Sequence, residues 1–426
     1  MSVAPSERRA QRVIGLCHAL LSERGEVSGA RLASDALDAY RQLDARSLDR
    51  FFDLLSTQFV PSRADVECRA SVYAIDPSPS NLIALQRAVE PPRQELFRRL
   101  NMAPGATGVL VQMRQRLLAT LEQHPHRAAV EFDLAHLLKS WFNRGFLRLQ
   151  RIDWRTSAIV LERLIQYEAV HEIAGWHDLR RRLQDDRRCY AYFHPALPEE
   201  PLIFIEVALT RHVTSHVQRL LDPDSPVIDP ATATCAVFYS ITSCQDGLRG
   251  ISFGNFLIKQ VVESLGRELR GIRTFATLSP VPGFRRWLTS EPAARERMPD
   301  GRSLVEMLDG AEWRTSRRSS AALRRSLMPL CARYLVDAKQ RDAPLDAVAR
   351  FHLANGARLE RLNWLGDTSP HGLERSAGIM VNYVYRLADV ERNHEAYAKA
   401  HKIVSSRRIE RLARGADARL PEPVSA

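Results

Sequence analysis

Several features are missing from this chain of 426 residues, and each absence excludes a class of protein. No run of about eighteen apolar residues is present, so we expect no membrane-spanning helix. The N-terminus lacks the apolar segment of a secretory signal, so the cytoplasm is the expected compartment. The 6 cysteines are scattered without a Cys-x-x-Cys pair, so we expect reduced thiols. A Gly-x-Ser-x-Gly motif is also missing, which argues against a serine hydrolase.

Lysine is scarce, because only 5 of the 61 basic residues are Lys and 56 are Arg. The arginines are dispersed among Asp and Glu, and no basic-aromatic interleaving typical of RNA-binding proteins is present. The net charge of +11 therefore reflects composition, and we expect no nucleic-acid partner. A positive surface is still suited to attract a polyanionic small molecule.

A metal site is not predicted either. His171 and His177 are the nearest approach to a zinc motif, but residues six apart do not share a helix face.

The N-terminal part of the chain has the periodicity of helices. Apolar residues recur at helical spacing, first at Val13, Cys17 and Leu20 and again at Phe51 and Leu55. We therefore predict that residues 1–165 form an all-α bundle of five to eight helices. A bridging helix over 151–174 is expected to lead out of it.

The remainder of the chain, residues 166–426, alternates strand-like and helical segments. Segments rich in β-branched and aromatic residues predict four strands, over 189–193, 202–209, 233–239 and 273–278. Residues 284–350 are predicted to be helical, and two long helical runs are predicted after Pro370, the first of them carrying Tyr385. The predicted class is α+β.

The most informative stretch is 238–262, which predicts a buried strand, a glycine-punctuated turn and an amphipathic helix. Gly247, Gly250 and Gly254 allow the backbone to approach a ligand closely. The helix that follows directs free N–H groups and its positive dipole end at the same space. We interpret the stretch as an anion cradle for phosphate; it matches neither a P-loop nor a dinucleotide fingerprint.

This cradle resembles the Arg/Gln-x-x-Gly-x-Gly/Ala pyrophosphate loop of the GNAT acetyltransferase superfamily, which binds coenzyme A. Further motifs, in order and at family-like spacing, resemble those of malonyl-CoA decarboxylases. They are Glu206-Val-Ala-Leu-Thr210, Thr277-Leu-Ser-Pro-Val-Pro-Gly-Phe284, Phe351-His-Leu-Ala-Asn-Gly-Ala357 and Asn363-Trp-Leu-Gly-Asp-Thr-Ser369. The resemblance runs from about Tyr167 to about Ile403.

The resemblance implies the fold and the reaction. Residues 166–426 would form a GNAT-like α/β catalytic domain with a mixed central sheet, and residues 1–165 an oligomerisation domain. The activity would be decarboxylation of malonyl-CoA to acetyl-CoA, with no cofactor because coenzyme A is part of the substrate. Relatives assemble as homodimers or homotetramers, so the same is expected here.

The resemblance also implies a binding site for the substrate. Its coenzyme A-binding residues would be Arg249, Gly250, Ile251, Ser252, Phe253, Gly254 and Asn255, with Tyr385 near the active site. Ser252 departs from the family, because animal relatives have an acidic residue there. Any role of that carboxylate is absent here or supplied elsewhere.

Ser279 is the first candidate catalytic residue. It follows a strand and precedes Pro280-Val-Pro282, where a serine commonly caps a turn. The matching family serine belongs to the active site. The resemblance therefore implies that Ser279 donates a hydrogen bond to the malonyl group and is not a nucleophile.

His352 is the second candidate. Beside Phe351 and Leu353 it has the setting of a half-buried structural histidine. Histidine is nevertheless the side chain best suited to proton transfer near neutral pH. The resemblance implies that His352 protonates the enolate carbon or polarises the carboxylate. Glu206, alone in an apolar strand, is expected to be functional or paired.

Two alternatives remain open. A GNAT-type acyltransferase would use the same cradle and need an acceptor site with a general base. A helical scaffold protein with a domain that only senses acyl-CoA would need neither Ser279 nor His352, so their presence argues against it.

Overall fold

The computed structural model describes residues 5–251, 253, 257–295, 302–310 and 312–415. The chain divides into two compact units. The helical unit comprises Met1–Arg148, Phe193–Leu202 and Gln245–Phe253, and the sheet unit comprises Leu149–Tyr192, Ile203–Cys244 and Gly254–Ala426. Among the described residues, none of the helices combines the length and hydrophobicity that a membrane crossing requires.

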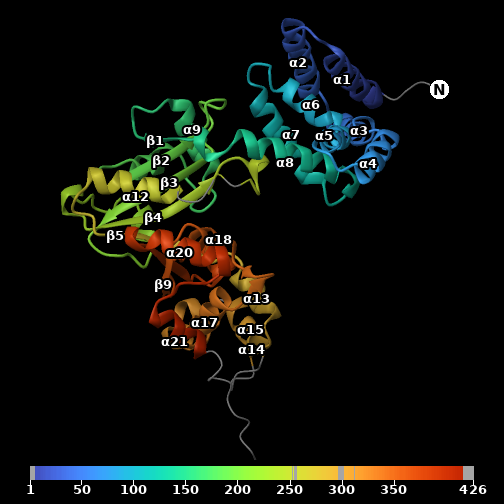
Figure 1. Ribbon diagram of the computed structural model, residues 1–426. Helices are drawn as coiled ribbons and strands as arrows, with labels where there is room; N and C mark the ends of the chain where they lie inside the picture. The colour runs from blue at the N-terminus through green and yellow to red at the C-terminus, as the bar shows by residue number, and fades with distance from the viewer. Residues whose placement is uncertain (1–4, 252, 254–256, 296–301, 311, 416–426) are drawn as a thin grey trace, which may run out of the picture. The chain divides into compact units, whose positions relative to one another are not determined.

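The helical unit consists of helices, drawn in blue to teal in Figure 1, most of which bury an apolar face in a shared core. Phe51, Leu55, Phe97 and Leu110 belong to its shared core. The predicted helical N-terminal region is therefore confirmed. Its helices are α1 (Pro5–Ser22), α2 (Glu26–Arg41), α3 (Ala45–Gln58), α4 (Arg63–Ile75), α5 (Pro79–Val89), α6 (Pro92–Leu100), α7 (Ala106–Thr120) and α8 (Ala128–Trp141).

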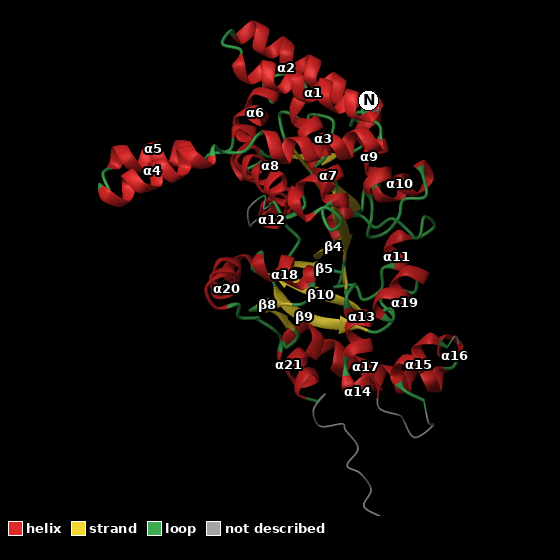
Figure 2. Ribbon diagram, turned by 90° about the vertical axis from the view of Figure 1, so that its right-hand side faces the viewer, coloured by secondary structure: helices red, strands yellow, loops and turns green. Residues whose placement is uncertain are grey.

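Helices α4 and α5 differ from the other helices of this unit. Ser62 caps α4 and Ser78 caps α5 through side-chain hydrogen bonds to backbone N–H groups. Neither helix contributes a buried residue. In Figure 2 the pair stands apart from the rest of the unit. The two helices pack on each other, and their outer faces are exposed.

The sheet unit contains a mixed sheet with the strand order β1-β2-β3-β4-β5-β10-β6, in which β9 also pairs with β10. β4 and β5 are parallel, whereas β3 is antiparallel to β2 and β4, and β10 is antiparallel to β5, β6 and β9. The predicted α+β class is therefore confirmed. The strands are β1 (Arg148–Ile152), β2 (Arg187–Phe193), β3 (Ile203–Thr210), β4 (Cys235–Ser243), β5 (Thr274–Thr277), β6 (Ser279–Pro280), β7 (Lys339–Gln340), β8 (Ala343–Pro344), β9 (Arg358–Asn363) and β10 (Met380–Tyr385).

Helices of this unit connect and surround the strands (Figure 2). The parallel strands β4 and β5 are joined by α12, as a parallel pair requires a crossover. Its helices are α9 (Ala158–Tyr167), α10 (Trp176–Arg182), α11 (Gln218–Leu221), α12 (Leu257–Glu268), α13 (Phe284–Ser290), α14 (Pro292–Arg295), α15 (Leu304–Asp309), α16 (Glu312–Thr315), α17 (Arg317–Val336), α18 (Ala347–Ala354), α19 (Pro370–Ser376), α20 (Leu387–Ala400) and α21 (Arg407–Arg414).

Three predictions of local structure are wrong at least in part. The segment 284–350, predicted to be helical, also contains the paired short strands β7 and β8. The expected bridging helix over 151–174 is replaced by β1, a turn and the shorter helix α9. In the turn, Asp153 accepts a hydrogen bond from the Arg155 backbone N–H, a local bond that competes with helix formation. The segment with Tyr385 is not helical, because it forms strand β10.

Candidate active site

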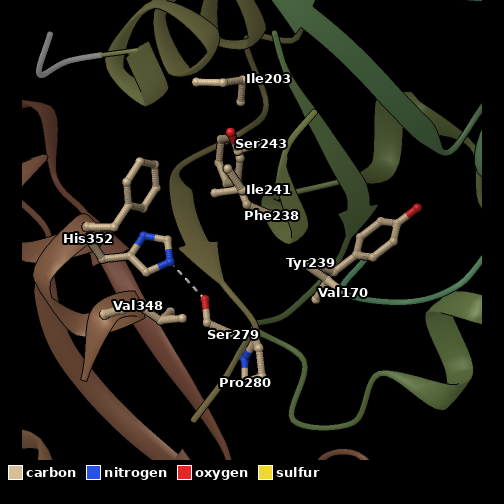
Figure 3. A pocket seen from close by; sticks show the side chains of 12 residues that line it. Val170, Ile203, Phe238, Tyr239, Ile241, Ser243, Ser279, Pro280, Val348 and His352 are labelled. Atoms are coloured by element: carbon tan, nitrogen blue, oxygen red, sulfur yellow. Dashed lines mark hydrogen bonds between the residues drawn. The ribbon is translucent and has the colours of Figure 1, made fainter. Parts of the chain in front are cut away.

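A cavity of about 240 Å³ opens in the sheet unit (Figure 3). Its wall comes from β3, β4, β6, α18 and the segment after α9. Most of the wall is apolar, and the polar groups that face it include the hydroxyl of Ser279 and the imidazole of His352. The lining residues are Val170, Ile203, Phe238, Tyr239, Ile241, Ser243, Ser279, Pro280, Ala347, Val348, Phe351 and His352.

The fold brings the two predicted catalytic residues together, although they are 73 positions apart in the chain. Ser279 Oγ lies 3.0 Å from His352 Nε2. Ser279 begins β6 and is placed by pairing with Val381 of β10. His352 lies on α18, which is capped by Asp346, whose carboxylate accepts the backbone N–H of Ala349.

The imidazole of His352 is neutral. It is only 2% exposed, and this burial lowers its pKa to about 3. Its Nδ1 lies 2.8 Å from the phenolic oxygen of Tyr385, and its ring stacks on Tyr383 with the centroids 4.6 Å apart. Burial raises the pKa of the Tyr385 phenol, so the phenol keeps its proton.

The hydrogen-bond partners favour one tautomer of His352. Ser279 donates its single hydroxyl proton to Thr277 Oγ1 at 2.9 Å. Ser279 Oγ must therefore accept from Nε2–H, which leaves Nδ1 to accept the O–H of Tyr385. The order of donors is Tyr385, His352, Ser279 and Thr277. The nitrogen that carries the proton is the one beside Ser279.

Tyr385 lies near the candidate catalytic pair, where the resemblance placed it. It is not among the residues that line the cavity, and it lies behind the imidazole, on β10. Its contact with the substrate stays a prediction. Its contact with His352 Nδ1 is the observed one.

Thr277 was missed by the sequence interpretation. Its Oγ1 accepts both the Ser279 hydroxyl and the backbone N–H of Tyr383 at 3.1 Å. Thr277 and Ser279 are two residues apart at the end of one strand segment, which is the signal that could have identified it. The apolar lining residues, such as Val170, carry no comparable sequence signal.

The predicted cradle is only partly described. Ser252, Gly254 and Asn255 lie outside the described residues. Ile251 and Phe253 are buried, so their side chains are packed within the protein. The Arg249 side chain is exposed, and Gly250 has φ +80° with no atom within 4 Å of an added Cβ.

Gly247 has a different role from the one predicted. A Cβ at this position would lie 2.0 Å from the backbone oxygen of Val111 on α7. The residue therefore permits close approach to a helix rather than to a ligand. Buried Arg114 holds the same loop by donating to the carbonyl oxygens of Gly247 and Arg249, at 2.7 and 2.9 Å.

Glu206 was expected to be either functional or paired, and the structure shows that it forms an ion pair. Arg182 Nη1 lies 2.9 Å from a Glu206 carboxylate oxygen, and both side chains are buried. Burial raises the pKa of Glu206 to about 7, against the opposing effect of Arg182. This ion pair links α10 to strand β3 and has a structural role.

Comparison with known proteins identifies the relatives of this chain. Residues 59–142 match the family model of the malonyl-CoA decarboxylase N-terminal domain, and residues 145–422 match that of the C-terminal domain. The mitochondrial malonyl-CoA decarboxylase of Anser anser anser is 39% identical over 346 residues, 75% of this chain and 69% of the relative. That of Rattus norvegicus is 36% identical over 352 residues, 76% of this chain and 72% of the relative.

Two solved structures resemble the whole fold. The malonyl-CoA decarboxylase of Rhodopseudomonas palustris has a TM-score of 0.91 at 48% identity and covers 94% of this chain and 99% of its own. That of Agrobacterium vitis has a TM-score of 0.89 at 50% identity, with the same coverage of 94% and 99%. The names of the animal relatives place those proteins in mitochondria; the cytoplasmic location of this chain stays a prediction.

Proposed function

Because the chain belongs to the malonyl-CoA decarboxylase family, we propose that it is a carboxy-lyase that converts malonyl-CoA to acetyl-CoA and carbon dioxide. The observation that carries this proposal is the contact of Ser279 with His352 at the apolar cavity. The reaction has two requirements, which are release of carbon dioxide from the malonyl carboxylate and protonation of the enolate that remains.

The cavity wall favours the first step. An ionised carboxylate is costly to place among apolar side chains such as Val348 and Phe351. Loss of carbon dioxide moves the negative charge from the carboxylate onto the thioester enolate, where it is delocalised. A hydrogen bond from Ser279 to the thioester oxygen then gains strength as charge develops there, on the scale of one oxyanion-hole contact.

The second step uses the protonated nitrogen of His352. The Nε2–H bond breaks and a C–H bond forms at the enolate carbon, either directly or through the hydroxyl of Ser279. The proton of Tyr385 moves to Nδ1. When a proton from solvent in the cavity binds Nε2, Nδ1 returns its proton to the Tyr385 phenolate, and both groups regain their starting state. A neutral imidazole is a sufficient acid here because a thioester enolate carbon is a much stronger base than the imidazole anion.

The residues that hold coenzyme A are proposed from the sequence. The loop from Arg249 to Asn255 would accept the pyrophosphate, supported by the open space at Gly250 and the exposed guanidinium of Arg249. Gly250→Val should raise the Michaelis constant strongly. Unchanged affinity for coenzyme A in this variant, measured by calorimetry, would remove the loop from the site.

One assay separates the proposed reaction from its alternatives. Incubation with malonyl-CoA alone should yield acetyl-CoA and carbon dioxide in equal amounts. An acyltransferase would release free coenzyme A only when an acceptor is added, and a sensor would bind without turnover. Either of those results would contradict the proposal.

We also propose that a second copy of this chain covers helices α4 and α5. Ile75 is 86% exposed and Ile83 is 50% exposed, on helices that bury nothing within their own unit. Two amphipathic hairpins from two copies can pack as a four-helix bundle and bury these residues by a two-fold interface. The helical unit would then carry the subunit contacts.

A further inference from the structure

A second set of cavities in the sheet unit is lined by arginines. One cavity, of about 560 Å³, lies between α17 and α21, and its lining includes Arg324, Arg325, Arg408 and Arg411. Another, of about 430 Å³, is lined by Arg324, Arg408 and Arg361 of β9. Because the two share Arg324 and Arg408, they form one groove, here called the arginine groove. Figure 2 shows α17 and α21 side by side, close to β9.

The arginine groove lacks compensating charge. Among the described residues, none of Arg324, Arg325 and Arg408 forms an ion pair with a carboxylate. Burial and the charge of Arg408 lower the pKa of Arg361, and the opposing effect of the Glu360 carboxylate is smaller. Two helices and a strand, far apart in sequence, therefore bring these guanidinium groups together. Nη2 of Arg361 donates to the backbone oxygens of Val213 and Thr214. The fork of N–H donors on each guanidinium group can bind two phosphate oxygens at once.

The remaining lining suggests the rest of the ligand. Trp364 lines the smaller cavity, and Met328 and Leu412 line the larger one. An aromatic face beside guanidinium groups is the usual setting for a stacked base. The ligand class that fits charge, size and surface together is a nucleotide with two or more phosphate groups.

The arginine groove is connected to the catalytic pair by hydrogen bonds. Arg361 Nε and Asn363 Nδ2 both donate to Asn382 Oδ1, at 3.1 and 2.8 Å. Asn382, which is 0% exposed, donates from Nδ2 to the backbone oxygen of Thr277 at 2.6 Å. Thr277 in turn accepts the hydroxyl of Ser279. A ligand that draws Arg361 towards the groove therefore acts, through Asn382, on Thr277, the residue that orients the Ser279 hydroxyl.

We propose that the arginine groove is a regulatory site for a nucleotide di- or polyphosphate, and that Arg361 and Asn382 transmit its occupancy to Ser279. The binding part is independent of the proposed reaction, whereas the transmission part rests on it. The two parts can therefore fail separately.

Calorimetry with pyrophosphate and with ADP tests the binding part. Both probes should bind the full-length protein, ADP more tightly because its base can stack on Trp364. The double variant Arg324→Gln/Arg408→Gln should weaken both by at least about tenfold, because two charge-assisted contacts are lost. Arg407→Gln is the matched control, since Arg407 is the exposed neighbour on α21 and does not line either cavity.

Three results would overturn the site. They are absence of binding by either probe, equal binding by the double variant, and binding that Arg249→Gln abolishes while the double variant keeps it. ADP that binds no more tightly than pyrophosphate would overturn the nucleotide class. For transmission, saturating pyrophosphate should change kcat for malonyl-CoA in the wild type and not in the double variant. An unchanged kcat with pyrophosphate bound would overturn the coupling to Ser279.

Discussion

The four hydrogen-bonded side chains Tyr385, His352, Ser279 and Thr277 are neutral, and each has a fixed number of protons to donate. Their hydrogen bonds therefore all run in one direction, from Tyr385 to Thr277. Thr277 Oγ1 receives the proton of Ser279, so Ser279 Oγ can only accept from His352 in the free protein. Substrate binding must then turn the Ser279 hydroxyl from Thr277 towards the thioester oxygen. The proposed roles of Ser279 and His352 in decarboxylation require this reorientation of the hydroxyl and a neutral His352.

The low pKa of His352 predicts the pH dependence of the free enzyme. A pKa of about 3 means that the imidazole is neutral throughout the range from pH 5 to pH 8. The profile of kcat/KM, which reports the free enzyme, should therefore show no inflection near pH 6.5 from this residue. An inflection there that disappears in His352→Gln would show that the imidazole titrates normally.

Tyr385→Phe tests the tautomer. The change removes the O–H that Nδ1 accepts, so the proton is no longer held on Nε2 and the ring is less well oriented. We expect kcat to fall by up to about a hundredfold, with the KM for malonyl-CoA nearly unchanged. The control is Tyr383→Phe, because the Tyr383 hydroxyl is buried without a hydrogen-bond partner among the described residues. Equal losses of kcat in the two variants would contradict a role for the Tyr385 proton.

Among the secondary-structure elements, sequence periodicity predicted the helices of the N-terminal region and the strands β2 to β5, because these have long or well-bounded patterns. It missed β10, whose six residues are buried on both faces and so show no alternation. The motifs proposed Ser279 and His352 and placed Tyr385 near them, but the hydrogen bonds that join these residues to one another and to Thr277 depend on pairing between β5, β6 and β10. That pairing is a long-range property with no local signal.

Gly247→Ala tests the packing of the loop on α7. Its Cβ would overlap the backbone oxygen of Val111 at 2.0 Å, and neither backbone can yield without moving Arg114. We expect destabilisation of about 1–3 kcal/mol, the range for overpacking, measured by thermal or urea unfolding. Gly15→Ala is the matched control, because its Cβ meets no atom within 4 Å on helix α1. It should be neutral or stabilising by up to about 1 kcal/mol; a similar loss in both variants would contradict the account.

At the scale of the whole molecule, the exposed faces of α4 and α5 predict the oligomeric state. Ile75→Asp combined with Ile83→Asp should lower the mass measured by light scattering, because charges would be buried in the proposed interface. Folding should be unaffected, since neither side chain is in the core. The control is Val27→Asp, an apolar residue that is 87% exposed on α2. An unchanged mass in the double variant would place the interface elsewhere, and a monomeric wild type would assign the faces to another partner.

In the proposed reaction Ser279 and His352 act together on one malonyl group, and a double-mutant cycle on kcat tests this most directly. His352→Ala should lower kcat by roughly two to four orders of magnitude, the range for loss of a general acid. Ser279→Ala should lower kcat more than it weakens binding, and the double variant should be little slower than the slower single variant. Losses that multiply fully, or a His352→Ala enzyme that keeps most of its activity, would contradict the assignment of the site.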